Sequence, residues 1–469
     1  MGVLFRKFME FAMGNGIVLI IGLISSPIIT RIILPEEYGK ASMFSTVTSL
    51  IIVVMTLGMD QAYTRFYNDE KEENRGRLLR KSIKLPLILN LILGVVLIIL
   101  YKPISNIIIK EVSFALVVLM LVHSTFSIVS RFALLNIRMK QKGKMYSSLT
   151  ILNKVVYLIS IIIIFMIFRN SYMTIVLATI IGNLAMSLVA MFYDRRDWFD
   201  LKKGELLNIK TKELFIYGRP FVFSMAIIWI FQSIDKISLR IFSGYEQIGL
   251  YAGAMTIVAL LNTFQGAFTT FWAPVAYEKY AKEPEDKEFF ININEIVTLI
   301  MLIISIVLIA LKDVVIKFLG NDYAGAEFIF PFLVLMPIMY TISETTVMGI
   351  NFGKNTKDHI YVAIISAIAN VIGNLILVPK YGAKGAAIST GLAYIIFFIA
   401  RTYYANKYYK VKYTLYKFWI CIAAVYILAG YSSIYKFNSI ILYLTIGSLG
   451  IVLVMYRNIF VDIIKKIKK

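Results

Sequence analysis

The chain has 469 residues, of which 59% are hydrophobic, and a mean hydropathy of +0.76. Soluble domains are only about 45–50% apolar, so this composition excludes a soluble globular protein and indicates one that crosses the membrane many times. The formal net charge is +21, which in a soluble chain would suggest nucleic acid. In a membrane protein, basic cytoplasmic loops explain it, and we expect no nucleic-acid partner.

Apolar runs of about 18–25 residues predict an all-α polytopic membrane protein with fourteen transmembrane helices. The first run has no small-residue cleavage site after it, so we expect it to be retained as a helix rather than removed as a signal peptide. The predicted spans are about 10–32, 39–60, 83–101, 112–137, 147–168, 172–193, 215–242, 247–274, 291–311, 326–350, 360–378, 382–405, 414–432 and 438–457.

Basic residues are distributed unevenly between the segments on the two sides of the predicted spans. If the N-terminus is cytoplasmic, the inner segments, including the one with Arg401, hold roughly thirty basic residues and the outer loops roughly eight. This bias predicts that both termini are cytoplasmic. The outer loops are too short for a soluble domain, so function must lie in the helices or at their faces.

Two predicted helices place cations within the apolar region. His123, Ser127 and Arg131 share one face of helix 112–137, and Lys154 lies at nearly the same depth in the next helix. Two like charges at one level repel each other unless something anionic lies between them. Arg131 and Lys154 are therefore the first candidates for binding an anionic substrate.

Helix 215–242 carries a second polar group. Gln232, Lys236 and Arg240 share a face, while Asp235 lies about 100° around the helix. Lys236 joins the candidate substrate-binding residues, and Asp235 is a candidate for ion coupling or gating. The segment from Arg240 also resembles the one from Arg31, about 210 residues earlier, which suggests two related halves.

The remaining candidates have competing interpretations. Arg31, Arg219 and Arg240 lie near helix ends, where they either contact the substrate or only extend to lipid headgroups. Glu344 is either a titrating group or half of a plain ion pair. Asp60 is a gating candidate that we interpret as the partner of a loop arginine. Asn370 and Asn374 are expected to join neighbouring helices, and His123 to be a satisfied interior group.

Metal and disulfide chemistry is not expected. The chain has one cysteine, Cys421 in an apolar run, and only two histidines, His123 and His359. A single cysteine excludes an intrachain disulfide, and no zinc-type spacing is present. We therefore expect no cofactor, with coupling to H⁺ or Na⁺ left open.

Three stretches resemble recurring segments of polysaccharide-biosynthesis flippases, relatives of multidrug extruders and lipid II flippases. They are ISSPIITRIILPEEYGKASMFSTVTSL from Ile24, SIDKISLRIFSGYEQIGLYAGAMTIVALL from Ser233 and NLILVPKYGAKGAAISTGLAY from Asn374. The resemblance implies two six-helix lobes related by a pseudo-two-fold around a central cavity, with two trailing helices. The corresponding domains are 1–196, 197–406 and 407–469, the last including a cytoplasmic basic tail. Lys236 stands where many relatives have a basic residue after the aspartate.

The resemblance also implies a function. Wzx-type members are thought to move an undecaprenyl-pyrophosphate-linked oligosaccharide from the inner to the outer leaflet of the bacterial cytoplasmic membrane. The expected partners are this anionic lipid-linked substrate, membrane lipids, and a glycan polymerase and chain-length regulator of O-antigen or capsule synthesis. A monomer is the expected state, and we expect a transporter rather than an enzyme.

Alternative functions stay open on the sequence. A multidrug or cation extruder and a lipid II flippase share the family resemblance, although a basic cavity is unfavourable for cationic cargo. A membrane glycan polymerase or glycosyltransferase generally needs a sizeable outer loop, which the predicted spans lack. A nucleotide-driven pump is disfavoured because the chain has no Gly-rich phosphate loop followed by Lys and Ser or Thr.

Overall fold

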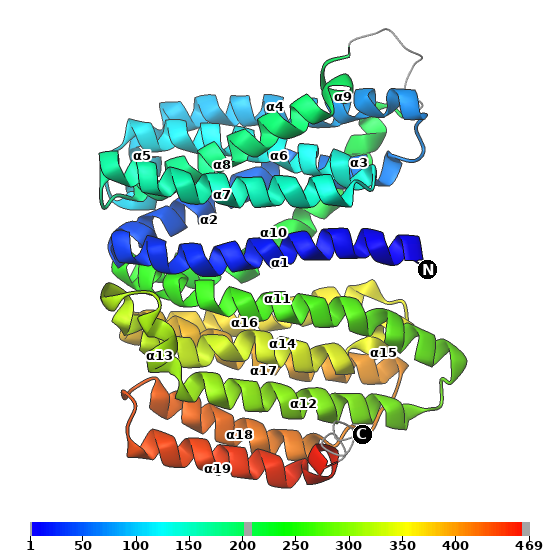
Figure 1. The fold of residues 1–469 in the computed structure, drawn as a ribbon, viewed down its shortest axis with the longest axis vertical. Helices are drawn as coiled ribbons and strands as arrows, with labels where there is room; N and C mark the ends of the chain where they lie inside the picture. Colours follow the sequence, from blue (N-terminus) through cyan, green and yellow to red (C-terminus); the bar gives the residue numbers. More distant parts are fainter. Residues whose placement is uncertain (1, 201–208, 462–469) are drawn as a thin grey trace. The chain divides into compact units, whose positions relative to one another are not determined.

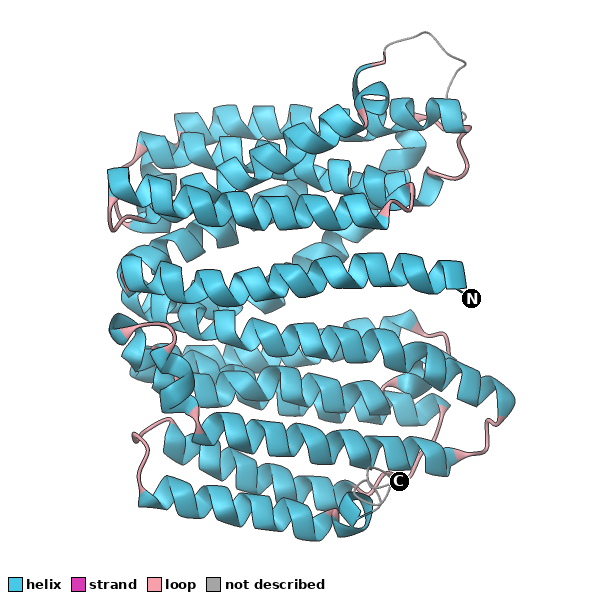
Figure 2. Cartoon of the chain, in the orientation of Figure 1, coloured by secondary structure: helices cyan, strands magenta, loops and turns pink. Residues whose placement is uncertain are grey.

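The computed structural model describes residues 2–200 and 209–461, and every regular element within these ranges is a helix (Figure 2). The prediction of an all-α membrane protein is confirmed. The chain divides into two compact units, residues 1–233 and residues 234–469, which Figure 1 colours from blue to green and from green to red.

Unit 1 contains the first nine α-helices and most of the tenth. They are α1 (Gly2–Ile32), α2 (Pro35–Thr56), α3 (Met59–Phe66), the 3-10 helix η1 (Glu72–Asn74), α4 (Arg75–Ile99), α5 (Tyr101–Ile109), α6 (Phe114–Met139), α7 (Gly143–Phe168), α8 (Tyr172–Tyr193), α9 (Arg195–Phe199) and α10 (Thr211–Phe242). Within this unit α7 packs against α1 and α8, and α6 packs against α4 and α8.

Unit 2 contains the end of α10 and the remaining helices. They are α11 (Tyr245–Lys282), α12 (Lys287–Ala310), α13 (Lys312–Lys317), the 3-10 helix η2 (Asn321–Phe328), α14 (Phe330–Thr346), α15 (Met348–Phe352), α16 (Thr356–Tyr381), α17 (Ala383–Tyr408), α18 (Leu415–Ser432) and α19 (Ser439–Met455). Almost all of α14 is buried between α11, α12 and α17, so it forms the core of this unit. The last two helices lie side by side on α12 (Figure 1).

Among the described residues, eleven helices are long and apolar enough to cross a membrane. The number rises to twelve if η2 and α14, which meet at an angle of 59°, form one bent span. Two shorter apolar helices, Gly16–Ile32 and Ser439–Met455, fall below that length. The count of fourteen spans therefore stays a prediction.

The two segments that resemble each other in sequence have the same local structure. α1 ends at Ile32 and α2 begins at Pro35, while α10 ends at Phe242 and α11 begins at Tyr245, so two residues separate the helices in each case. Each second helix has acidic residues in its first turn, which its N-terminal dipole favours. Pro35 fits the first turn because its missing N–H would be unpaired there anyway.

The second span is broken where the sequence predicted a continuous helix over 39–60. Leu57 and Gly58 have φ angles of 49° and 65°, and this left-handed turn ends α2 and starts α3. A Cβ atom on Gly58 would lie 2.1 Å from the carbonyl oxygen of Gly218 in α10. The two backbones can approach this closely because glycine lacks a side chain. The break places Asp60 at the start of α3 instead of the end of the second helix.

Candidate functional site

Arg131 and Asp60 form an ion pair inside unit 1. Both Nε and Nη2 of Arg131 donate to Oδ2 of Asp60, at 2.9 and 2.5 Å. The Asp60 side chain is 1% exposed and that of Arg131 is 41% exposed, so the guanidinium contacts the buried carboxylate and keeps part of its surface accessible. The partner of Asp60 is therefore an arginine in the middle of α6, and the interpretation that it pairs with a loop arginine is wrong.

Lys154 lies on α7, half-buried, with its Nζ 5.7 Å from the centre of the Tyr157 ring. It forms no ion pair with any residue in the described ranges 2–200 and 209–461. The residue before it, Asn153, donates to Asn183 of α8 at 3.0 Å, and Asn183 donates to Ser127 of α6 at 3.2 Å. This polar chain joins the helices that carry Lys154 and Arg131. The two cations themselves make no direct contact within the described residues.

In unit 2, Asp235 lies at the centre of a buried hydrogen-bond network. Its Oδ2 accepts from the Tyr251 hydroxyl at 2.6 Å and from Thr390 Oγ1 at 2.7 Å. Its Oδ1 accepts from the amide groups of Asn374 and Asn370, at 2.6 and 3.2 Å. Four donors from α11, α16 and α17 therefore converge on one carboxylate of α10. The amides were predicted to join neighbouring helices, and they do so through Asp235.

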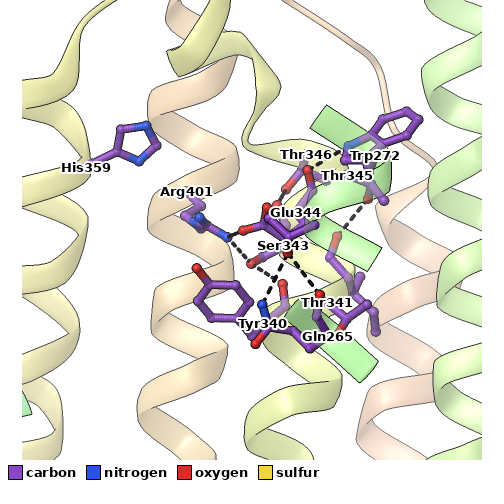
Figure 3. Close-up of polar contacts among 12 residues, drawn as sticks. Gln265, Trp272, Tyr340, Thr341, Ser343, Glu344, Thr345, Thr346, His359 and Arg401 are labelled. Carbon is purple, nitrogen blue, oxygen red and sulfur yellow. Dashed lines mark hydrogen bonds and ion pairs between the residues drawn. The ribbon is translucent and has the colours of Figure 1, made fainter. Parts of the chain in front are cut away.

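Glu344 pairs with Arg401, which reaches from α17 to α14 (Figure 3). Nη1 of Arg401 lies 2.7 Å from Oε1 of Glu344 and donates to Ser343 Oγ at 2.8 Å. Both charged side chains are 8% exposed. Glu344 is therefore one half of an ion pair, the second of its two sequence interpretations. Arg401, which the sequence analysis counted among the inner basic residues, lies within α17, and its side chain is buried in the helix bundle.

Four other candidate residues lie at less enclosed positions. Arg31 and Arg219 are exposed, and Lys236 is half-buried next to Asp235 in sequence. Arg240 is also half-buried, with its guanidinium 5.1 Å from the centre of the Tyr245 ring. Within the described residues, neither Arg31 nor Arg219 contacts the ion pairs described above.

His123 is buried in α6, with its ring edge-on to Phe44 at a centroid distance of 5.5 Å. Its Nδ1 has no hydrogen-bond partner within the part of the chain that the structure describes, so it differs from the satisfied interior group that we expected. No group of three or more His, Cys, Asp or Glu side chains suited to a metal ion occurs in the described ranges.

The family model described as polysaccharide biosynthesis protein matches residues 4–279, more than half of the chain. The chain belongs to this family. An uncharacterized membrane protein of Methanocaldococcus jannaschii is 24% identical over 80% of this chain and 78% of its own length. A probable low-salt glycan biosynthesis flippase of Haloferax volcanii, Agl15, is 22% identical over 49% of each chain.

Solved structures identify the fold of this family member. The inward closed conformation of the lipid II flippase MurJ superposes with a TM-score of 0.71 over 98% of this chain and all of that one, at 16% identity. An inward-facing multidrug transporter of the MATE family gives a TM-score of 0.55 over 84% of this chain and 94% of the other, also at 16% identity. The protein is therefore a multi-pass membrane protein whose fold is similar to that of these two transporters.

Several polar residues of these networks were missed by the sequence analysis. Asn153, Asn183, Tyr251 and Thr390 are uncharged residues within apolar runs, where they are common and carry little signal singly. Their spacing from each other in sequence gives no indication of a shared cluster. The helical-face argument placed Ser127 on the same face as Arg131, but it could not identify the asparagines that connect α6 to α7.

Proposed function

We propose that the protein moves an oligosaccharide linked to undecaprenyl pyrophosphate from the inner to the outer leaflet by alternating access, for O-antigen or capsule biosynthesis. The family assignment and the MurJ-like fold support a lipid-linked cargo. We infer that its pyrophosphate is bound within unit 1 by Arg131 and Lys154, with contributions from Arg31 and Arg219. Lys236 and Arg240 of unit 2 stay candidate substrate-binding residues. The cytoplasmic membrane is the proposed location, with both termini inside and a glycan polymerase and chain-length regulator as partners.

The observation that carries this proposal is Lys154. It lies within an apolar helix and has no ion-pair partner in the described part of the chain. A charge at the centre of the membrane costs about 2.5–3.5 kcal/mol on the insertion scale, so such a residue is retained for a function. Arg131 adds donors, because Asp60 occupies only Nε and Nη2 of its guanidinium. Together they favour an anionic ligand over a cationic drug.

Export assays test this proposal. We expect Lys154→Ala to abolish display of the surface glycan at unchanged membrane abundance, because it removes a donor for the pyrophosphate. Arg131→Ala should abolish display too, but it leaves the buried Asp60 carboxylate without its partner, so its export is compared at equal membrane abundance with that of Asp60→Ala/Arg131→Ala. Lys102→Ala, an exposed lysine at the start of α5, serves as the control and should export normally. Normal export by both Lys154 and Arg131 variants would exclude these residues from the substrate site.

The cargo itself is tested by depletion. Loss of the protein should cause a lipid-linked oligosaccharide to accumulate in the inner leaflet. Accumulation of lipid II instead would favour the lipid II flippase alternative. Accumulation of a cationic dye in depleted cells, reversed when the protein is restored, would favour a cation extruder.

We further propose that Asp235 is the coupling residue of the transport cycle. Its neighbours supply oxygen atoms suited to a small monovalent cation such as Na⁺. Thr390 and Tyr251 present hydroxyls, and rotating each asparagine side-chain amide by about 180° would present its carbonyl oxygen. Oδ1 of Asn374 has no hydrogen-bond partner among the described residues. One carboxylate with neutral oxygens matches the charge of a single Na⁺ or H⁺.

Coupling through Asp235 predicts a distinct kinetic result. In proteoliposomes, an imposed Na⁺ or proton gradient should accelerate flipping by the wild type, and Asp235→Asn should remove that acceleration. Asn374→Ala should weaken it by shifting the ion concentration required. Glu344→Gln is the comparison variant from the ion pair: if it alone removed the gradient dependence, Glu344 rather than Asp235 would couple transport.

A further inference from the structure

One end of unit 1 contains a polar pocket of about 650 Å³ that lies outside the residues assigned above. Its walls come from the start of α4, the turn between α6 and α7, and the junction of α8 and α9. The orientation predicted from the basic residues places this end at the cytoplasmic surface. The volume is within the range of about 300–1,000 Å³ that is typical of small-molecule sites.

The floor of the pocket is a fixed network of buried polar groups. Lys140 Nζ lies 2.8 Å from Asp194 Oδ1 and 2.6 Å from Asp197 Oδ2. Asn136 donates to both carboxylates at 2.9 Å, and the Tyr63 hydroxyl donates to Asn136 at 2.7 Å. Burial opposes the charge of Lys140, but hydrogen bonds to the two aspartates outweigh it and raise the pKa of the lysine. Lys142 Nζ also lies 3.8 Å from Asp194 Oδ1, so two lysines face the two carboxylates of the floor.

The rim of the pocket is basic. Arg75, Lys142, Arg195 and Arg196 line it, and Glu72 is the only acidic lining residue besides the two aspartates of the floor. Arg195 and Arg196 are exposed, and Lys142 lies 4.5 Å from the centre of the Tyr193 ring. Arg75 lies 4.5 Å from the centre of the Tyr67 ring. Apart from the paired residues of the floor, most of the charged side chains that line the pocket are cations. Two of these cations, Arg75 and Lys142, lie beside aromatic rings.

We propose that this pocket binds the phosphate of a lipid headgroup at the cytoplasmic surface, as a second site separate from the transport site. Arginine donors suit phosphate oxygens because the planar guanidinium can donate two parallel hydrogen bonds. Basic pockets between membrane helices on the cytoplasmic side are suited to anionic headgroups. The space beyond a phosphate group accommodates an attached glycerol or sugar, which the exposed Tyr193 can contact.

Two sources of this phosphate can be distinguished experimentally. The full-length protein is placed in nanodiscs of phosphatidylcholine, and binding of radiolabelled pyrophosphate is measured by equilibrium dialysis. In parallel, native mass spectrometry measures retention of phosphatidylglycerol in mixed nanodiscs. Pyrophosphate binding supports a site for the diphosphate of a lipid carrier, and retention of phosphatidylglycerol alone supports a site for membrane phospholipid.

The double variant Arg195→Ala/Arg196→Ala should weaken whichever ligand binds by about tenfold, since a charge-assisted hydrogen bond contributes at least that factor. The matched control is Arg138→Ala/Lys144→Ala, which removes the same charge from exposed positions at the same end that do not line the pocket. Binding of neither ligand to the wild type, or an equal loss in both double variants, would overturn the proposal. These experiments measure only binding to the pocket. Normal export by Lys154→Ala would therefore leave the proposed phosphate site unaffected.

Discussion

At the scale of single residues, Arg401 is held by both aromatic rings and hydrogen bonds. Its guanidinium lies beside the stacked rings of Tyr340 and Phe397, at 4.8 and 4.7 Å from their centres, and donates to Ser343 and Glu344. A planar cation stacks on aromatic faces and donates in its own plane at the same time, which an ammonium cannot do. The site is therefore specific for arginine.

This geometry predicts that Arg401→Ala destabilises unit 2 by about 3–5 kcal/mol, because it leaves the Glu344 carboxylate buried without a partner. Arg401→Lys should recover only part of the loss. The double variant Arg401→Ala/Glu344→Ala should be more stable than Arg401→Ala, since no buried charge remains. Thermal unfolding of the purified proteins in one detergent measures all three. Equal melting temperatures for Arg401→Ala and the wild type would show that the pair contributes no net stability.

The sequence predicted which charged residues matter better than it predicted their partners. Arg131, Lys154, Asp235 and Glu344 stood out because a charge within an apolar run is costly. The partners of two of them could not be predicted, because Asp60 is 71 residues from Arg131 and Arg401 is 57 residues from Glu344. Sequence patterns show which face of a helix is polar, whereas the pairing of faces depends on tertiary packing.

At the scale of elements, Gly58 and Gly218 form a close backbone contact between the α2–α3 turn and α10 in unit 1. A Cβ on Gly58 would lie 2.1 Å from the Gly218 carbonyl oxygen, and one on Gly218 would lie 2.7 Å from the Leu57 carbonyl oxygen. Both atoms belong to backbone, so neither can move without displacing a helix. The positive φ of Gly58 adds strain for any other residue.

We therefore predict that Gly58→Ala and Gly218→Ala each lower the melting temperature, with a cost of about 1–3 kcal/mol. Gly447→Ala, in α19 with no neighbouring atom within 4 Å of the new Cβ, is the matched control. It should leave stability unchanged or raise it slightly, because alanine favours helix more than glycine. A melting temperature for Gly58→Ala equal to that of this control would contradict the close contact.

The turn between α11 and α12 has a carboxylate that should make stability depend on pH. Asp286 accepts from the Phe289 N–H at 3.1 Å as the N-cap of α12, and from Lys279 Nζ at 2.5 Å. Hydrogen bonds from Lys279 and from that backbone N–H hold its pKa below the ordinary value of 3.8. Because the folded pKa is the lower one, the stabilisation is complete above the ordinary pKa and disappears as the pH falls through the folded pKa.

The melting temperatures of wild type and Asp286→Ala should accordingly differ by a constant amount between about pH 5 and 7 and converge below the ordinary pKa of about 4. Glu285→Ala removes a neighbouring carboxylate whose one reported ion pair, with Lys287, is longer at 3.4 Å, and should show a smaller difference. A difference between wild type and Asp286→Ala that persists unchanged at pH 3 would rule out this assignment.

Hydropathy predicted the membrane helices well but not their interruptions. A window average detects about twenty apolar residues whether or not the helix is continuous, so the break at Leu57 and Gly58 was read as helix. The 59° bend between η2 and α14 was likewise included in one span over 326–350. The separation of spans 360–378 and 382–405 is found in the structure, where α16 and α17 meet at Gly382, whose φ of 55° favours glycine.

At the scale of the whole molecule, the distribution of basic residues predicts one orientation. Only one cysteine is present, Cys421, and it is fully buried, so a Cys421→Ala background suits labelling of new cysteines. A membrane-impermeant maleimide added to intact cells should label Lys102→Cys and Lys436→Cys but not Arg138→Cys or Lys357→Cys. Labelling of Arg138→Cys and Lys357→Cys alone would show that the topology is inverted. Labelling of Lys102→Cys without Lys436→Cys, or the reverse, would exclude an even number of spans between these two positions.

The ion pair of Glu344 and Arg401 has an electrical consequence for a protein that works in a polarised membrane. Because its charges cancel, α14 and α17 carry no gating charge at this position, and a joint displacement of the pair does no net work against the field. Lys154 has no such compensation in the described residues. Moving its charge through 100 mV exchanges about 2.3 kcal/mol, so α7 is a helix on which voltage can act.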